Sequence, residues 1–200
     1  MKAMILAAGF GTRLWPLTID RTKPAIPFLG KPLVGYVAEY LANFGIKDVV
    51  VNLHHQPESV IESLGDGSEF GVHIEYAREE PKILGTAGAL DNARKWLEDE
   101  PFLVVNGKII TDIDIAAALD THKRSGAIAT MILKPNAKRE KFTIVDAEDG
   151  WLTGFGDYAT PTTEKEIRNP DTPAPNPLMF TGIHILDPRV FEYIPQGVYS

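Results

Sequence analysis

The sequence predicts an α/β fold with a doubly wound, mostly parallel sheet flanked by helices. Short runs rich in valine, isoleucine and leucine recur along the first 133 residues, as is typical of strands buried on both faces. Segments with apolar residues at helical spacing separate these runs, and such alternation favours right-handed βαβ crossovers. After residue 134 the pattern changes to a polar turn and a proline-rich stretch, which predicts a small hairpin and flap region.

Each expected element follows from its local pattern. The expected strands of the first part are 4–6, 48–53, 72–76, 102–105 and 127–133, and the expected helices are 34–44, 59–64, 86–97 and 113–125. Gly45 and Gly65 directly follow two of these helices and read as stop signals. In the second part, strands at 143–146 and 151–155 flank a polar Glu-Asp-Gly turn. A loop or flap at 158–177, a strand at 179–186 and a short helix at 188–193 complete the expected order.

The composition restricts the class of protein. Two hundred residues suit one domain of ordinary size, and a formal charge of −7 argues against a general nucleic-acid binder. The absence of cysteine excludes disulfides, thiolate catalysis and cysteine-ligated zinc. No apolar run approaches the roughly 20 residues of a membrane span, and no signal peptide is recognisable. We therefore expect a cytoplasmic enzyme or binding protein with no membrane partner.

The chain is organised around residues 4–24, MILAAGFGTRLWPLTIDRTKP. Gly9 and Gly11 permit unusual backbone dihedrals and let main-chain N–H groups approach an anion. Arg13 and Lys23 add two cations, so the loop predicts a polyphosphate site. A purely structural turn is one alternative. A dinucleotide-binding turn would need a third glycine where Leu14 stands, and the P-loop pattern fails because no Gly-Lys-Ser/Thr follows.

Other polar motifs receive simpler interpretations. In the turn 84–88, LGTAG, the simpler interpretation is that Thr86 is a helix N-cap and has no part in binding. His54 and His55 are expected at a strand end, where neighbouring side chains point to opposite faces. Glu79 and Glu80 are expected to form an exposed acidic pair.

The order Leu-Ala-Ala-Gly-x-Gly-Thr-Arg-Leu-x-Pro-Leu-Thr, followed by Lys23-Pro24, resembles the signature of the sugar-phosphate nucleotidyltransferases, or NDP-sugar pyrophosphorylases. These include mannose-1-phosphate guanylyltransferases and glucose-1-phosphate nucleotidyltransferases. The resemblance implies a Rossmann-like sheet and transfer of a nucleoside monophosphate from an NTP to a sugar 1-phosphate, giving NDP-sugar and pyrophosphate. It also implies one nucleotidyltransferase domain over 1–200, truncated at the C-terminus relative to the family, with a nucleotide-binding half at 1–133 and a sugar-side part at 134–200. Assembly into a homo-oligomer is left open.

The resemblance also implies roles for individual residues, with Arg13 and Lys23 as the catalytic pair. The backbone near the base would be that of Leu6, Ala8 and Gly9. The β- and γ-phosphates would lie on Gly11, Thr12 and Arg13, and the α-phosphate near Lys23. The base and ribose would meet Gly85, Thr86 and Gly88, and the sugar phosphate would meet Thr181 and Gly182.

One position departs from the family pattern. Where an aspartate usually binds the catalytic Mg²⁺, this chain has Lys108, and a protonated lysine cannot ligate a cation. Three explanations stay open: Asp112 substitutes as the metal ligand, the Lys108 ammonium replaces part of the metal's charge, or the chain is a regulatory homologue that binds nucleotides or NDP-sugars without efficient turnover. A nicotinamide-dependent oxidoreductase is a weaker alternative that rests on the two glycines alone.

Overall fold

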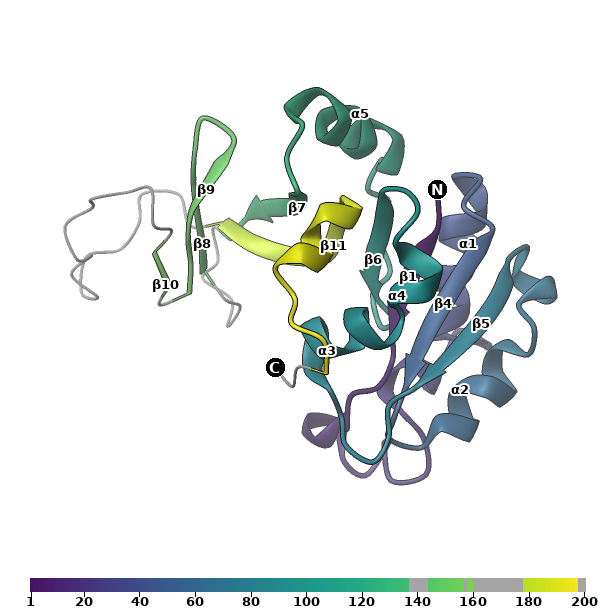
Figure 1. Ribbon diagram of the computed structural model, residues 1–200. Coiled ribbons are helices and arrows are strands. Elements are labelled where there is room, and N and C mark those ends of the chain that lie inside the picture. The colour runs from purple at the N-terminus through teal and green to yellow at the C-terminus, as the bar shows by residue number, and fades with distance from the viewer. Residues whose placement is uncertain (137–143, 157, 160–177, 198–200) are drawn as a thin grey trace. The chain divides into compact units, whose positions relative to one another are not determined.

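The computed structural model describes residues 1–136, 144–156, 158–159 and 178–197 (Figure 1). The chain divides into two compact units, which we describe separately. The first comprises Met1–Thr130 and His184–Ser200, and the second Met131–Ile183. Most of the predicted flap at 158–177 lies outside the described residues.

The first unit is built on four parallel strands in the order β5-β4-β1-β6. They are β1 (Ala3–Leu6), β4 (Asp48–Leu53), β5 (His73–Arg78) and β6 (Phe102–Asn106). Leu6, the last residue of β1, lies opposite Asn52 of β4 and Asn106 of β6. The strands predicted from the apolar runs are confirmed, and their carboxyl ends share one edge of the sheet.

Helices cover both faces of this sheet, as predicted. Figure 1 shows α1 (Leu33–Asn43) and α2 (Pro57–Leu64) on one side, and α3 (Gly85–Asn92) and α4 (Arg94–Leu97) on the other. The fifth helix is α5 (Ile115–Ser125), which Asp114 caps by accepting from two backbone N–H groups. The single helix expected at 86–97 is wrong, because Ala93 leaves helical geometry and divides it in two.

The core explains the uninterrupted apolar runs. Met4, Val50 and Val104 pack with the buried residues of α3 and α4. The alternate residues Ile5 and Val51 are also buried, with no measurable exposure. Side chains of successive strand residues point to opposite faces, so both faces of the sheet are buried here. The strands therefore consist of continuous apolar runs and do not alternate apolar with polar residues.

The connection after β1 contains short elements that the sequence pattern did not reveal. Two 3₁₀ turns, η1 (Thr12–Leu14) and η2 (Lys23–Ala25), precede a small hairpin of β2 (Pro27–Phe28) and β3 (Lys31–Pro32). Leu29 and Gly30 form its turn, both with positive φ. Prolines in this stretch prevent a long helix, so the chain here is held by local turns.

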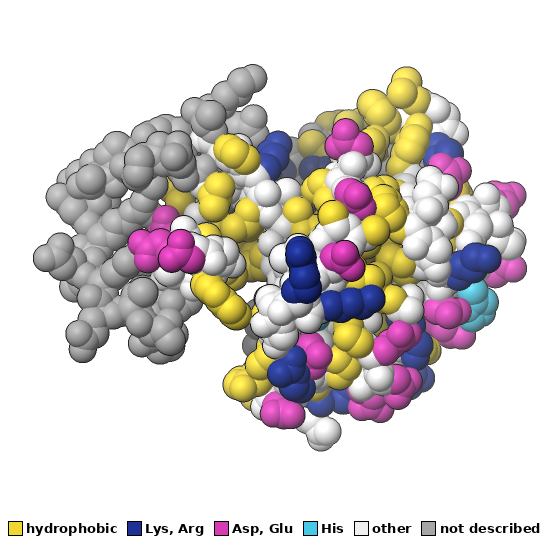
Figure 2. Space-filling model, turned by 90° about the horizontal axis from the view of Figure 1, so that it is seen from above, with side chains coloured by type: hydrophobic (Ala, Val, Ile, Leu, Met, Phe, Trp, Pro, Cys, Tyr) yellow, Lys and Arg dark blue, Asp and Glu magenta, His cyan; other side chains and the backbone are white. Residues whose placement is uncertain are grey.

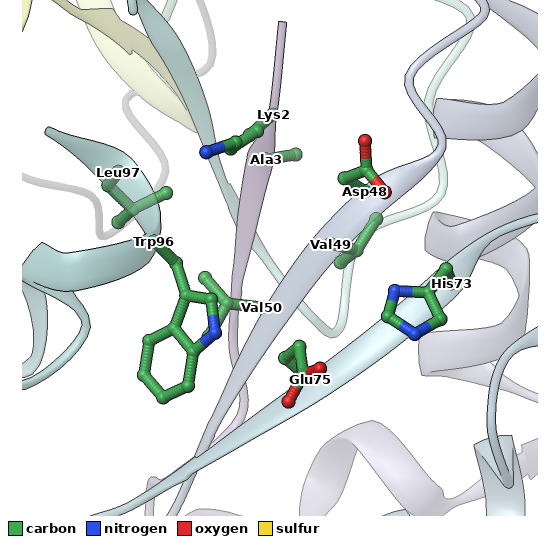
Figure 3. A pocket seen from close by; sticks show the side chains of 9 residues that line it. All are labelled: Lys2, Ala3, Asp48, Val49, Val50, His73, Glu75, Trp96 and Leu97. Atoms are coloured by element: carbon green, nitrogen blue, oxygen red, sulfur yellow. The ribbon is translucent and has the colours of Figure 1, made fainter. Parts of the chain in front are cut away.

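A hollow lies at the amino ends of β1, β4 and β5, the edge opposite their carboxyl-terminal loops. Figure 3 shows its lining: Lys2, Ala3, Asp48, Val49, Val50, His73, Glu75, Trp96 and Leu97. Figure 2, which views the molecule from this side, shows acidic and basic side chains interspersed among the described residues. Ligands of open α/β sheets bind at the carboxyl ends of the strands, so the phosphate site predicted for the glycine loop after β1 does not lie in this hollow.

The second unit is mainly antiparallel. Its strands are β7 (Ala129–Pro135), β8 (Ile144–Glu148), β9 (Trp151–Phe155), β10 (Tyr158–Ala159) and β11 (Leu178–Leu186), of which the first and last also reach into the first unit. β8 and β9 form the predicted hairpin, with Asp149 and Gly150 both at positive φ in its turn. The expected terminal helix is a 3₁₀ helix, η4 (Pro188–Glu192). Within the described residues, no helix is long and apolar enough to cross a bilayer.

Candidate functional site

Three loops of the first unit leave the same edge of the sheet. The signature loop, which is the part of residues 4–24 that follows β1, is the first of them. The turn at 84–88 comes after β5, and Lys108 comes two residues after β6. Because β1, β5 and β6 run parallel, their carboxyl ends lie together. The topology therefore brings most of the residues singled out in the sequence to one edge, where open α/β sheets bind ligands.

The two glycines of the signature loop serve different purposes. Gly11 has a φ of +66°, and a methyl group there would lie 3.1 Å from Cγ2 of Thr18. The buried Thr18 hydroxyl donates to the Gly11 carbonyl at 3.0 Å, which fixes the bend. Gly9 has no positive φ, and no atom lies within 4 Å of the position its Cβ would take. Gly11 therefore shapes the loop, whereas Gly9 leaves open space beside the backbone.

This difference predicts unequal costs for the same substitution. Gly11→Ala is expected to lower the free energy of unfolding by about 1–2 kcal/mol, because alanine is strained at positive φ and meets Thr18. Gly9→Ala is expected to change it by less than about 0.5 kcal/mol. Urea unfolding of both variants measures the difference. Equal losses would show that Gly9 is also required by the backbone.

Two cationic side chains of the loop, Arg13 and Lys23, act on a third, Lys108. Arg13 is exposed on η1, and Lys23 begins η2, whose Pro24 and Ala25 are buried. The Thr22 N–H donates to the Ser59 hydroxyl at 3.1 Å, which anchors the backbone beside Lys23. Partial loss of hydration and the positive charges of Lys23 and Arg13 lower the pKa of Lys108. Lys108 is exposed, and both cations of the loop therefore act on it by charge repulsion.

A buried polar network, not predicted from the sequence, links the signature loop to the turn at 84–88. The Ala7 N–H donates to Oδ1 of Asn52 at 2.7 Å, and Nδ2 of Asn52 donates to Oε1 of Glu79 at 2.6 Å. The second carboxyl oxygen of Glu79 accepts from the Leu84 N–H at 2.7 Å. The expectation of an exposed Glu79 is wrong: its side chain is 1% exposed, whereas Glu80 is exposed.

The network also corrects the interpretation of Thr86. The helix α3 begins at Gly85, one residue earlier than expected, with Leu84 in the capping position and no side-chain cap. Thr86 therefore lies inside the helix and is not its N-cap, and the Leu84 N–H at the helix start donates to Glu79. Gly85 has a φ of +71°, which gives this glycine a backbone reason for its place. Thr86 is exposed, and Gly88 is buried in α3.

The histidine pair lies beyond the strand rather than on it. β4 ends at Leu53, so the expected opposite orientation does not apply. The Phe10 ring contacts both imidazoles, with centroids 5.7 Å from His54 and 5.4 Å from His55. Nδ1 of His54 hydrogen-bonds the Glu79 carbonyl at 2.8 Å. These contacts attach the signature loop to the end of β4.

Lys108 occupies the position where the family resemblance expects a metal-binding aspartate, and the role of Asp112 as a substitute ligand stays a prediction. Divalent cations such as Mg²⁺ prefer several oxygen ligands, and here the charged neighbours of Lys108 are cations. Asp112 lies near Tyr40, and desolvation together with the charges of Asp112 and Asp114 raises the pKa of that tyrosine to about 12. No cluster of three or more His, Cys, Asp or Glu side chains suited to a metal occurs among the described residues.

The residues expected on the sugar side lie on β11, in the second unit. The Thr181 hydroxyl donates to the Ile132 carbonyl of β7 at 2.7 Å. Gly182 is buried and has a φ of +88°. Their local geometry is therefore set by the pairing of β7 with β11, and their part in binding stays a prediction.

Comparison with known proteins places this arrangement in context. The profile of the family described as nucleotidyl transferase matches residues 2–199. The chain is 35% identical to a UTP–glucose-1-phosphate uridylyltransferase of Synechocystis over 98% of its own length and 52% of that protein. It is 36% identical to an N-acetylmuramate α-1-phosphate uridylyltransferase of Neisseria meningitidis, covering 98% of this chain and 80% of the relative. A solved Bacillus anthracis structure assigned as a glucose-1-phosphate thymidylyltransferase superposes with a TM-score of 0.78 at 25% identity, covering 96% of this chain and 74% of that one. The chain thus spans about half the length of the cyanobacterial relative.

Proposed function

Because the chain belongs to the sugar-phosphate nucleotidyltransferase family, we propose that it transfers a nucleoside monophosphate from an NTP to a sugar 1-phosphate. The products are an NDP-sugar and pyrophosphate. The observation that carries the proposal is the meeting of a glycine loop, Arg13, Lys23 and the turn at 84–88 at one edge of a parallel sheet. A cytoplasmic location, where nucleoside triphosphates are available, belongs to the same proposal.

The proposed reaction is a displacement at phosphorus. An oxygen of the sugar phosphate attacks the α-phosphorus of the NTP, the bond from that phosphorus to the bridging oxygen breaks, and pyrophosphate leaves with the electron pair. The attacking phosphate is already ionised near neutral pH, so no general base is needed. Catalysis then depends on alignment and on neutralising phosphate charge, which explains a site with glycines and cations in place of a nucleophile and its base.

The roles proposed for the first unit follow the positions of its residues, and those proposed for Thr181 and Gly182 follow the family resemblance. Open space beside Gly9 would admit the base next to the backbone of Leu6 and Ala8. Main-chain N–H groups at Gly11 and Thr12, with the Arg13 guanidinium, would hold the β- and γ-phosphates. Lys23 would lie at the α-phosphate and stabilise its transition state. The turn with Gly85, Thr86 and Gly88 would contact base and ribose, and Thr181 and Gly182 would contact the sugar phosphate.

Family members commonly use a divalent metal such as Mg²⁺. The side chains around Lys108 do not suit such an ion, so the roles above are assigned to the chain's own groups alone. The proposed domain is the whole chain of 1–200, with its nucleotide-binding half at 1–133 and its sugar-side part at 134–200.

Release of pyrophosphate tests the proposed function directly. The purified protein is incubated with UTP, GTP or dTTP, each paired with glucose 1-phosphate, mannose 1-phosphate or N-acetylmuramate 1-phosphate. These pairs follow the substrates named for its relatives. We expect release with at least one pair and formation of the matching NDP-sugar, identified by mass. Reactions without the sugar phosphate serve as the control.

Two results would contradict the proposal. Pyrophosphate release that does not depend on any sugar phosphate would indicate NTP hydrolysis. Tight NTP binding without release from any pair would indicate a protein that recognises nucleotides without transferring them.

A further inference from the structure

The position of Lys108 is determined by close backbone packing between β1, β6 and η2. The Gly107 N–H donates to the Leu6 carbonyl at 3.0 Å. A Cβ at Gly107 would lie 2.9 Å from Cγ2 of Ile5, 3.0 Å from the Leu6 oxygen and 3.5 Å from Cβ of Pro24. Only glycine fits here, and Pro24 directly follows Lys23. The chain therefore brings Lys108 beside Lys23 through backbone contacts rather than through a flexible side chain.

The cationic cluster of Arg13, Lys23 and Lys108 lacks internal neutralisation. Within the part of the chain that the structure describes, none of the three forms an ion pair, although Lys2, Arg21, Lys31, Arg78, Arg94 and Arg189 each do. The charges that act on Lys108 are those of Lys23 and Arg13, and both are repulsive. Such a cluster is stabilised by a polyanion that lies among all three groups.

The same charges oppose a divalent cation. A metal ion beside Lys108 would meet three positive side chains, and hard cations require oxygen ligands that this cluster does not contain. A polyphosphate free of metal carries more negative charge than its magnesium complex. Its attraction to the cluster is therefore stronger, and its oxygens are free to accept from all three cations.

We infer that Lys108 is a third phosphate-binding cation, and that it gives the site a preference for a polyphosphate free of divalent metal. The inference rests on the proposed function in taking this polyphosphate to be the tail of a nucleotide or the pyrophosphate it releases. It goes further in assigning Lys108 to the ligand and in reversing the usual effect of magnesium on binding.

Calorimetric titration of the whole chain tests this inference. The probes are UTP, GTP and inorganic pyrophosphate, each titrated in EDTA and again in excess MgCl₂ at equal ionic strength. We expect at least one probe to bind about tenfold more tightly in EDTA. Lys108→Met should weaken that binding by about tenfold, the change typical of one charge-assisted hydrogen bond. Lys108→Asp should reverse the preference, so that binding becomes tighter with magnesium.

Lys47→Asp is the matched control. Lys47 is the exposed residue directly before β4, at the opposite edge of the sheet, and the substitution makes the same change in charge. It should leave the ratio of affinities in EDTA and magnesium unchanged within about twofold. An equal effect of both aspartate variants would show that only net charge matters and would overturn the inference.

The comparison of EDTA with magnesium uses the wild-type protein, so it tests the inference even where a variant fails to fold. Tighter binding of all three probes in magnesium, or no binding of any probe in EDTA, would overturn the inference. Its failure is distinct from failure of the proposed function. Pyrophosphate release with magnesium-dependent binding refutes only the role of Lys108, whereas metal-free binding without release refutes only the transfer reaction.

Discussion

Replacing Glu79 with alanine is expected to lower the free energy of unfolding by about 3 kcal/mol. The carboxyl group accepts from Asn52 Nδ2 and from the Leu84 N–H, and the side chain is 1% exposed. Alanine would leave the buried Asn52 amide and the partly buried Leu84 N–H without these acceptors, and an unsatisfied buried group costs about 1–3 kcal/mol. Urea or thermal unfolding followed by circular dichroism measures this loss.

Glu80→Ala is the control for that experiment, because Glu80 is the adjacent residue, carries the same side chain and is exposed. It should change stability by less than about 0.5 kcal/mol. Glu79→Gln retains one acceptor and should recover part of the stability. Equal effects of Glu79→Ala and Glu80→Ala would contradict the role of Glu79 as the buried acceptor for Asn52 and Leu84.

Replacing Arg13 with alanine is expected to reduce kcat/KM for pyrophosphate release by about 100-fold, a loss typical of removing one group that stabilises transition-state charge. Arg13 is exposed and forms no ion pair among the described residues, so folding should be unaffected. The assay is the productive NTP and sugar-phosphate pair identified above, with stability measured in parallel.

Arg13→Lys separates charge from geometry. Lysine retains the positive charge but lacks the planar fork that binds two phosphate oxygens at once, so activity should fall between those of the wild type and the alanine variant. Activity of Arg13→Ala within about twofold of the wild type would contradict the placement of the triphosphate on η1.

Local sequence patterns were sufficient to predict most of the strands and helices. The valine run at 49–51 and the apolar run at 102–105 are buried on both faces, so their strands could be recognised without knowledge of their partners. Gly65 adopts positive φ directly after α2, and Gly45 does so one residue beyond α1, after the capping Phe44, as stop signals require. The hairpin of β2 and β3 escaped prediction because strands of two residues leave no periodic pattern.

The environment of Glu79 could not be predicted for a different reason. The carboxyl group of Glu79 accepts from Asn52, 27 positions earlier, and from Leu84, 5 positions later. Only the parallel pairing of β4 with β5 places Asn52 next to Glu79. Two adjacent glutamates in a sequence are typical of a solvent-exposed segment. A lone asparagine within the apolar run of β4 was the one available signal, since a buried polar side chain requires a partner.

The sequence by itself determined the alternation of strands and helices, the glycine loop and the resemblance to a nucleotide-handling family, because these depend on residue type and spacing. Only the tertiary structure decided that Gly11 is required by the backbone while Gly9 leaves space, that Glu79 is buried, and that Lys108 joins Arg13 and Lys23. The physical reason is that burial and electrostatic repulsion arise between groups far apart in the chain. They become definite when parallel strands bring their carboxyl ends to one edge.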